Sequence, residues 1–394
     1  MAFKALALLA LASFSQAKKS TSTSTTHTTT HTAIHTATYA TSASATAPLT
    51  TTYSIPTAAT ANPTASAPTV DDGTEHIQYS TVSGYFLQDI NTTNASTFDY
   101  TAVNFGLINQ TYPSDCGSGG NLTQWERFAR VLFSLNQEAP ASTVYKLLFI
   151  GRHGEGYHNA AQTYYGTPAW NCYWSEQSGN STATWADAHL TVNGIAQALL
   201  RLSLTRCLQT ANYTYGNLSL PAYYPFRPTV REFFREGISI HTCDRRSNRT
   251  YIASTYPNFV IDADLSEDDE IWNGVTSETN SAQDYRSKLA LDSVFSSDPS
   301  RVISITTHSG EGASLLRVLG HIPFSLSTGA IIPVLVKAET IKSMPSATTT
   351  QPWTTSAWCT NGPPVSSETA LPYACVCSNG VSPVAATPTV SFGA

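Results

Sequence analysis

Two stretches of the chain are almost continuously apolar, and each leads into a short segment that contains a histidine and a glycine. Residues 144–150 read VYKLLFI and are followed by GRHG, and residues 302–306 read VISIT and are followed by THSG. Apolar runs of this length predict strands that are buried on both faces of a parallel sheet. Because ligands bind outside the carboxyl ends of the strands in open α/β sheets, we expect His153 and His308 to lie on two sides of one pocket.

Helical spacing of apolar residues predicts two further elements. Residues 122–136 place Trp125, Phe128 and Leu132 at helical spacing, and residues 190–202 have a similar pattern. Helices that alternate with buried strands are typical of the α/β class.

Segments of low complexity flank this predicted domain. Of the 50 residues in 20–69, 26 are Ser or Thr, and large apolar side chains are almost absent. Such a composition cannot bury enough apolar surface to fold, so we interpret residues 18–72 as a disordered, O-glycosylated stalk. Folded structure is expected over residues 73–343, and residues 344–394 form a tail that contains Thr, Pro and Cys.

Several features predict export. Residues 1–17, MAFKALALLALASFSQA, place a lysine ahead of a short apolar run and end in a small-x-small pattern, as in a cleaved signal peptide. Seven cysteines allow up to three disulfides in an oxidising compartment, and a local clasp is expected among Cys359, Cys375 and Cys377. Eight sites fit the N-glycosylation pattern: Asn91, Asn94, Asn109, Asn121, Asn180, Asn212, Asn217 and Asn248. We therefore expect a secreted or cell-wall protein without a membrane span.

Charge and metal-ligand spacing exclude two classes of function. The formal net charge of −6 and a charged fraction of 12% argue against nucleic-acid binding through a basic face. The stalk histidines His27, His31 and His35 are sparser than tracts that bind metal, and no other Cys or His cluster has ligand spacing. We expect neither a metal nor a cofactor.

The segment after the first predicted strand carries groups that suit an anion. Arg152 is a fixed cation, His153 can act as a nucleophile, and the adjacent glycines bring backbone N–H groups close to a ligand. Phosphoryl transfer depends mainly on positioning and charge neutralisation, and histidine can form covalent intermediates. An isolated histidine at a sheet edge is ordinarily structural, but two matched strand ends favour a catalytic interpretation.

Five motifs, taken in order, resemble those of one family. They are GRHGEGYHN (151–159), DAHLTVNGIAQA (187–198), TRCLQTA (205–211), REGISIHTCDRRS (235–247) and THSGEG (307–312). They are similar to motifs of the histidine phosphatase superfamily, in its phosphoglycerate-mutase-like branch, and together cover roughly residues 77–340. The resemblance implies a three-layer αβα fold with a mostly parallel central sheet.

The resemblance also implies roles for individual residues. His153 would be the nucleophile that becomes phosphohistidine, and the phosphoryl oxygens would be held by Arg152, Arg206 and His308. Asn159 matches an asparagine near the phosphate, and Glu155 would orient the loop.

The proton donor to the leaving oxygen would be Glu236, with Glu232 as an alternative four residues earlier. A carboxylic acid can fill this role near neutral pH only if its pocket raises its pKa. Asp244, Arg245 and Arg246 would either line the substrate mouth or form a structural ion-pair cluster.

The chain departs from the family pattern between two of these motifs. The family normally places the rest of a helix, a loop and a central strand before the arginine motif, whereas GIAQALLRLSLTRCLQTA leaves no room for them. About 20 residues are missing by ordinary element lengths. We expect residues 199–208 to be helical instead. Either an exon is missing from the predicted coding sequence, which we favour, or the deletion is real and Arg206 is displaced.

We therefore expect a secreted phosphatase that hydrolyses a small phosphomonoester through a phosphohistidine. The first alternative is a catalytically inactive cell-wall or surface glycoprotein with a degenerate phosphatase domain. The Thr-rich stalk and the missing strand support this alternative. The second is a phosphoglycerate-mutase-type phosphotransferase. Phytate-type activity belongs to another branch, whose Arg-His-Gly-x-Arg and His-Asp motifs are absent here.

Overall fold

The computed structural model describes residues 75–115, 122–198, 205–216, 218, 220, 225–342, 353–364, 375–377 and 383–385. The predicted signal peptide, the stalk with its three histidines, Asn121 and Asn217 lie outside the described residues.

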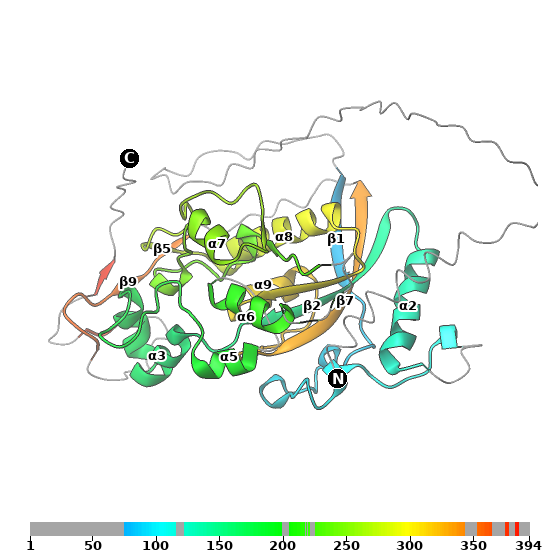
Figure 1. Ribbon diagram of the computed structural model, residues 1–394, viewed down its shortest axis with the longest axis horizontal. Coiled ribbons are helices and arrows are strands. Elements are labelled where there is room, and N and C mark those ends of the chain that lie inside the picture. The colour runs from blue at the N-terminus through cyan, green and yellow to red at the C-terminus, as the bar shows by residue number, and fades with distance from the viewer. Residues whose placement is uncertain are drawn as a thin grey trace, which may run out of the picture.

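A four-stranded sheet forms the centre of the molecule (Figure 1). Its order is β1 (Glu75–Thr81), β7 (Ile331–Lys342), β2 (Thr143–Arg152) and β6 (Val302–Thr307). β2 pairs with β6 in parallel, and β7 runs antiparallel to both β1 and β2. The described sheet is therefore mixed rather than mostly parallel, because its longest strand, β7, returns against the direction of β2.

Helices cover both faces of this sheet, which confirms the three-layer α/β architecture. On one face, α2 (Gln124–Glu138) packs Phe128 and Leu132 against Leu147 and Phe149 of β2. On the other face, α8 (Asn280–Ser297) and α9 (Ser309–Val318) share a core with the alternate residues of β2. Figure 1 shows α2 on one side of the strands and the α8–α9 pair on the other.

The remaining elements are short. The helices are α3 (Tyr157–Tyr165), α4 (Thr167–Cys172), α5 (Val192–Ala198), α6 (Thr205–Tyr215) and α7 (Arg249–Thr255). β3 (Thr229–Val230) pairs with β4 (Val260–Ile261), β5 (Thr276–Ser277) with β8 (Thr354–Thr355), and β9 (Ala357–Trp358) with β10 (Val384–Ala385). Single 3-10 turns are Leu87–Asp89, Ala95–Thr97, Asn104–Gly106, Pro113–Asp115, Trp174–Glu176, Glu232–Phe234 and Thr242–Asp244.

The predicted elements are found close to their expected positions. The helix expected over 122–136 is α2, and the strands expected over 144–150 and 302–306 are β2 and β6. The helix expected over 190–202 corresponds to α5, and of the stretch 199–208 the residues from Thr205 onward belong to α6. Residues 199–204 lie outside the described residues, so the expectation of a missing strand stays a prediction.

Among the described residues, one disulfide lies within the tail and a second attaches the tail to the domain. Cys359 bonds to Cys377 within the tail, as a local clasp requires, and Cys375 bonds to Cys172 at the end of α4. The remaining described cysteines, Cys207 and Cys243, are free and buried.

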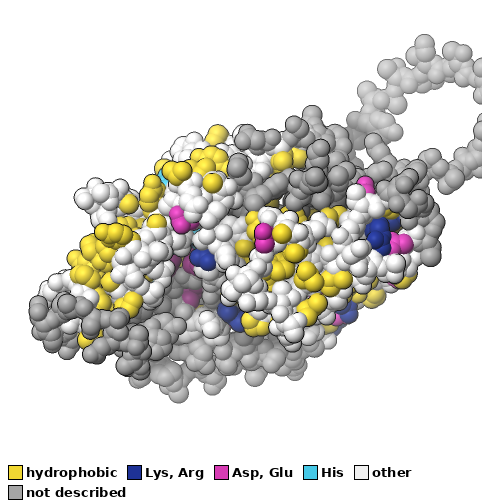
Figure 2. Space-filling model, turned by 90° about the horizontal axis from the view of Figure 1, so that it is seen from below, with side chains coloured by type: hydrophobic (Ala, Val, Ile, Leu, Met, Phe, Trp, Pro, Cys, Tyr) yellow, Lys and Arg dark blue, Asp and Glu magenta, His cyan; other side chains and the backbone are white. Residues whose placement is uncertain are grey.

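The described surface agrees with the low charge content of the chain. On the face shown in Figure 2, Lys and Arg side chains are few and scattered among apolar and uncharged ones. None of the described helices combines the length and apolar character that crossing a bilayer requires.

Candidate active site

The register of two parallel strands places two histidines face to face. Arg152 at the end of β2 pairs with Thr307 at the end of β6, so His153 and His308 follow at the same edge of the sheet. Their ring centroids are 4.9 Å apart, and the side chains are 1% and 0% exposed. The structure thus brings together two residues that are more than 150 positions apart in the chain.

A backbone contact fixes the tautomer of His153. Its Nδ1 lies 2.6 Å from the carbonyl oxygen of Gly154, which can only accept a hydrogen bond. The proton therefore sits on Nδ1, and Nε2 keeps a free lone pair. Burial, followed by the nearby charges of Arg206 and Arg152, lowers the pKa of His153 well below its usual value. The ring is neutral and nucleophilic at Nε2.

Arg206 connects α6 to the second histidine. Its Nη2 lies 2.9 Å from Nδ1 of His308, and its Nη1 donates to the carbonyl oxygen of Cys243 at 2.8 Å. Because a guanidinium only donates, His308 Nδ1 accepts and the ring is neutral. Burial and the charge of Arg206 lower the pKa of His308 well below its usual value. Despite the departure from the family pattern before α6, Arg206 lies in the site.

Three buried nitrogens in this cluster have no partner among the described residues: Arg152 Nε, Arg206 Nε and His158 Nδ1. Arg152 donates through Nη1 to the carbonyl oxygen of Leu326 at 3.0 Å, which holds its head group at the strand end. Two guanidinium groups with unused donors beside neutral imidazoles form an environment suited to an oxyanion with several acceptor oxygens.

The loop after His153 is held by α5 and by Thr191 directly before it. Thr191 Oγ1 donates to Glu155 Oε1 at 2.6 Å, and the N–H of Glu155 donates to Gln197 Oε1 at 2.8 Å. A Cβ at Gly154 would collide with the carbonyl oxygen of Gly194, so both glycines allow the loop and α5 to approach closely. Glu155 therefore orients the loop.

His158 is a site residue that the sequence reasoning missed. Its ring centroid lies 5.3 Å from that of His153, and its side chain is 9% exposed. Asn159, which was expected near the phosphate, accepts a hydrogen bond from the N–H of Gly156 at 3.0 Å through Oδ1. It therefore closes the first turn of α3. The position of His158 in the first turn after the loop is the signal that could have identified it.

Glu236 lies at the N-terminus of α9, beside His308. Its Oε1 accepts hydrogen bonds from the N–H groups of Gly237 (2.9 Å) and Glu311 (3.0 Å), and its Oε2 is 4.0 Å from His308 Nδ1. Burial, followed by the charge of Asp244, raises the pKa of Glu236. With a side chain 18% exposed, Glu236 lies on the more open side of the cluster.

Glu232 has a different environment. Its two carboxylate oxygens pair with Arg235 at 2.7 Å and Arg246 at 2.6 Å, and Arg235 also pairs with Asp269 at 2.6 Å. Both carboxylate oxygens of Glu232 are therefore used in a structural ion-pair cluster. Because Glu236 lies beside His308 and has no such arginine pair among the described residues, the geometry favours Glu236 as the proton donor.

The Asp244-Arg245-Arg246 segment is divided between these environments. Arg246 belongs to the ion-pair cluster, Asp244 is buried, and Arg245 is exposed.

One group of side chains near the site has the residue types of a metal site. Ligand atoms of His241, Cys243 and Asp244 lie within 4.8 Å of one another. The Cys243 thiol faces Asp244 Oδ1 at 3.6 Å, and Ser239 Oγ donates to Asp244 Oδ2. Burial raises the pKa of Cys243 well above its usual value, so the sulfur is a thiol and the carboxylate already has donors. The group forms a hydrogen-bonded cluster.

The fold and the cluster at the strand ends define a protein suited to phosphoryl transfer through histidine. No protein-family model matches the chain. It is 44% identical to a "Probable phosphoglycerate mutase" of Arthroderma benhamiae over 291 residues, which covers 68% of this chain and 87% of the relative. It is 31% identical to the "Probable phosphoglycerate mutase PMU1" of Saccharomyces cerevisiae, covering 57% of this chain and 92% of the relative. The chain therefore belongs to the histidine phosphatase superfamily, in its phosphoglycerate-mutase-like branch.

Solved structures give weaker similarity. An alpha-ribazole phosphatase of Shigella flexneri matches 50% of this chain and 96% of its own length at 18% identity, with a TM-score of 0.29. A phosphoglycerate mutase of Thermus thermophilus matches 50% of this chain and 99% of its own length at 17% identity, with a TM-score of 0.23. TM-scores of this size do not establish a shared fold.

Proposed function

We propose that the protein is a secreted phosphatase that hydrolyses a small phosphomonoester through a phosphohistidine on His153. The observation that carries the proposal is the free Nε2 of a buried, neutral His153 among donors without acceptors on Arg152 and Arg206. A phosphoryl group at Nε2 would give these donors their acceptors and bring negative charge into a site that holds two guanidinium groups.

The residues supply a balanced two-step reaction. His153 Nε2 attacks phosphorus, the bond to the leaving oxygen breaks, and Glu236 gives its proton to that oxygen. Glu236, now a carboxylate, then takes a proton from water, whose oxygen attacks the phosphohistidine. The P–N bond breaks, phosphate leaves, and both side chains return to their starting states. Arg152 and Arg206 donate to the phosphoryl oxygens in both steps, and His308 joins them when the negative charge of the phosphoryl group favours a proton on its Nδ1.

Three features support the secreted part of the proposal. Residues 1–17 resemble a signal peptide, and the described residues contain two disulfides, which persist in oxidising compartments. Every glycosylation candidate within the described residues is exposed: Asn91, Asn94, Asn109, Asn180, Asn212 and Asn248.

The test uses the purified full chain and an aryl phosphate without added metal. We expect the protein to release phosphate and His153→Ala to release none. When the reaction is quenched during turnover without acid, a mass spectrum should contain a phosphorylated His153 peptide. His76→Ala is the matched control, because His76 lies on β1 at the opposite edge of the sheet. Equal turnover by His153→Ala would overturn the proposal. Silence of both forms would favour the inactive surface glycoprotein.

The names of the relatives favour one second candidate, a phosphoglycerate-mutase-type phosphotransferase. Both activities would share the phosphohistidine and differ in the acceptor of the phosphoryl group. Incubation with 3-phosphoglycerate, followed by phosphorus NMR, separates them. The phosphatase releases inorganic phosphate, whereas the mutase produces 2-phosphoglycerate faster than free phosphate.

A further inference from the structure

Helix α6 lies where a helix that follows a parallel strand would lie. Near its start, Arg206 contacts His308 just beyond the carboxyl end of β6, and near its end the hydroxyl of Tyr215 lies 2.9 Å from Ser304 Oγ in the middle of β6. The helix therefore runs back along β6, as a crossover helix does after a parallel strand. Among the described residues, the element before it is α5, which ends at Ala198.

The outer edge of β6 has backbone groups that pair with no strand among the described residues. Leu147 N–H donates to Arg301 O and His153 N–H donates to Thr307 O, so the odd-numbered residues from 301 to 307 face β2. Because successive residues of a strand point their backbone groups to opposite sides, Val302, Ser304 and Thr306 present N–H and C=O to the other side. Within the described part of the chain, no strand pairs with that side.

A second backbone edge faces the same space. Val260 N–H donates to Pro228 O, and Asp262 N–H donates to Val230 O. By the same alternation, Thr229 in β3 points its N–H and C=O away from β4. Both Thr229 and Ser304 line the space between them, together with Thr306, whose buried Oγ1 has no partner among the described residues.

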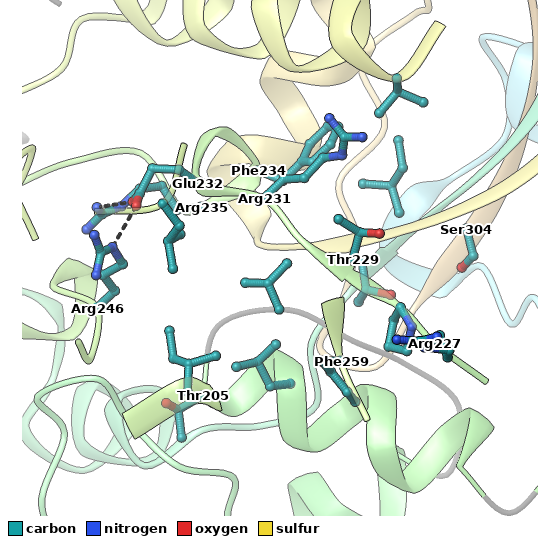
Figure 3. Close-up of a pocket in the computed structure, with 18 of the residues that line it drawn as sticks. Thr205, Arg227, Thr229, Arg231, Glu232, Phe234, Arg235, Arg246, Phe259 and Ser304 are labelled. Atoms are coloured by element: carbon teal, nitrogen blue, oxygen red, sulfur yellow. Dashed lines mark hydrogen bonds and ion pairs between the residues drawn. The ribbon is translucent and has the colours of Figure 1, made fainter. Parts of the chain in front are cut away.

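This space is a cavity of about 330 Å³ (Figure 3). It extends along five consecutive β6 residues, 302–306, which correspond to about 16 Å of strand. Figure 3 shows Thr229 and Ser304 on one side of the cavity and Thr205 and Phe259 near α6 on another. Apolar side chains make up much of the remaining wall: Leu208, Val230, Phe234, Ile252, Leu265 and Val294. The lining suits the apolar side chains of a buried strand.

The comparison with a relative agrees in size with an additional segment. The alignment with the Arthroderma protein spans 291 positions but covers 68% of 394 residues, which is about 268 residues. The aligned part of this chain is therefore interrupted by about 23 gap positions in total, as many as a strand and its two connections need.

We propose that this cavity is the seat of a parallel β-strand, carried by a segment of about 20 residues between Ala198 and Thr205 in a longer form of this protein. The segment would pair with Val302, Ser304 and Thr306 on one side and with Thr229 on the other. It would make β6 an interior strand and join β3 and β4 to the central sheet. Its end would lead into α6 and so fix the start of the helix that carries Arg206.

The first test concerns the existence of the longer form. We expect cDNA from the producing organism, and peptides of the native protein, to contain additional residues between Ala198 and Thr205. Transcripts and native peptides that all join these two residues as here would overturn this part of the proposal.

The second test concerns the seat and is independent of activity. The residues that the Arthroderma relative has between the positions aligned with Ala198 and Thr205 are inserted into the full chain, and a relative without additional residues at this place would overturn the proposal. Amide exchange at Val302, Ser304 and Thr306 is then followed by mass spectrometry or NMR. We expect exchange at these amides to slow by about 100-fold and the Tm to rise. A matched insertion with two prolines in the strand cannot pair and should leave the exchange fast.

Equal amide exchange in the two insertion variants would overturn the proposal that a strand binds in this cavity. If the inserted chain does not fold, the same segment is added as a peptide to the present chain. Slower exchange at the three amides with that peptide, and not with its proline variant, would support the seat, and unchanged exchange would overturn it. Since no amide readout depends on phosphate release, failure of this inference is distinguishable from failure of the phosphatase proposal.

Discussion

Two glutamates four positions apart, Glu232 and Glu236, have opposite electrostatic environments. Glu232 lies between two arginines, whereas burial raises the pKa of Glu236, which faces His308. We expect Glu236→Gln to lower kcat about 10²- to 10⁴-fold, because the leaving oxygen loses its proton donor. The loss should be smaller for an aryl phosphate with a nitro group, whose leaving oxygen needs no proton, than for an alkyl phosphate. Steady-state kinetics on both substrates measure this difference.

Glu232→Gln is the matched control. It removes the charge between Arg235 and Arg246, so we expect a loss of about 1–3 kcal/mol in the free energy of unfolding. The fall in kcat should be smaller than the fall that Glu236→Gln causes. A larger loss of kcat in Glu232→Gln, with the Tm unchanged, would assign the proton donor to Glu232.

The pH dependence of the reaction follows from two pKa shifts. Burial raises the pKa of Glu236, and burial with the charges of Arg206 and Arg152 lowers the pKa of His153. The reaction needs Glu236 protonated and His153 neutral. As the pH falls, His153 stays neutral to below its usual pKa, and as the pH rises, activity is lost when Glu236 ionises. We therefore expect an acidic optimum in kcat/KM.

The profile of Glu236→Gln checks this assignment. A glutamine cannot ionise, so the fall in kcat on the alkaline side should disappear while the acidic side stays. The phosphate monoester itself titrates near pH 6, and a comparison of kcat with kcat/KM separates its ionisation from that of the enzyme. An unchanged alkaline limb in the variant would contradict the role of Glu236.

At the scale of elements, Gly310 in the first turn of α9 determines how closely Glu236 can approach the helix N-terminus. A Cβ at this position would stand 2.5 Å from Glu236 Oε1. We expect Gly310→Ala to displace the carboxyl group and lower kcat about 10- to 100-fold. The Tm should hold or rise, since alanine favours a helix more than glycine does. Kinetics and thermal unfolding of the same preparation measure both effects.

Gly312→Ala is the control within the same helix. A Cβ there would meet Leu326 Cδ1 at 3.7 Å, which is ordinary contact distance. This variant should keep its kcat and gain a similar helix propensity. Equal kcat values for both variants would show that the position of Glu236 does not limit the reaction.

The elements that the sequence predicts are those whose burial follows a simple pattern. β2 and β6 are continuous apolar runs, and α2 has an apolar face. α8 was not predicted, because it buries Gln283, Arg286 and Ser287 and so lacks an apolar stripe. β7 was not predicted either, because Pro333 interrupts its apolar run and proline is rare inside sheets.

The site shows the same division between local pattern and tertiary contact. The strand ends predict that His153 and His308 meet, because the geometry of a parallel sheet dictates it. The unlike roles of Glu232 and Glu236, and the packing of His158 against His153, depend on contacts with other elements. No periodicity in the chain contains that information.

At the scale of the whole molecule, the bond between Cys172 and Cys375 joins the tail to α4 across 203 positions of sequence. Closing so long a loop restricts the unfolded chain strongly, so we expect the double variant Cys172→Ser/Cys375→Ser to lose about 2–4 kcal/mol of stability. β8, which pairs with β5, should also become protease-sensitive. Thermal unfolding and limited proteolysis without reductant measure the two effects.

The second disulfide provides the comparison that separates attachment from local order. Cys359 and Cys377 are 18 positions apart and both lie in the tail, so Cys359→Ser/Cys377→Ser should loosen the tail while Cys375 still holds it to α4. We expect a smaller fall in Tm than for the first pair, because the closed loop is shorter. Since Cys207 and Cys243 are free, reductant should lower the Tm of the unmodified chain, among the described cysteines, through the four bonded ones. A Tm that neither double variant nor reductant changes would show that the tail contributes nothing to the stability of the domain.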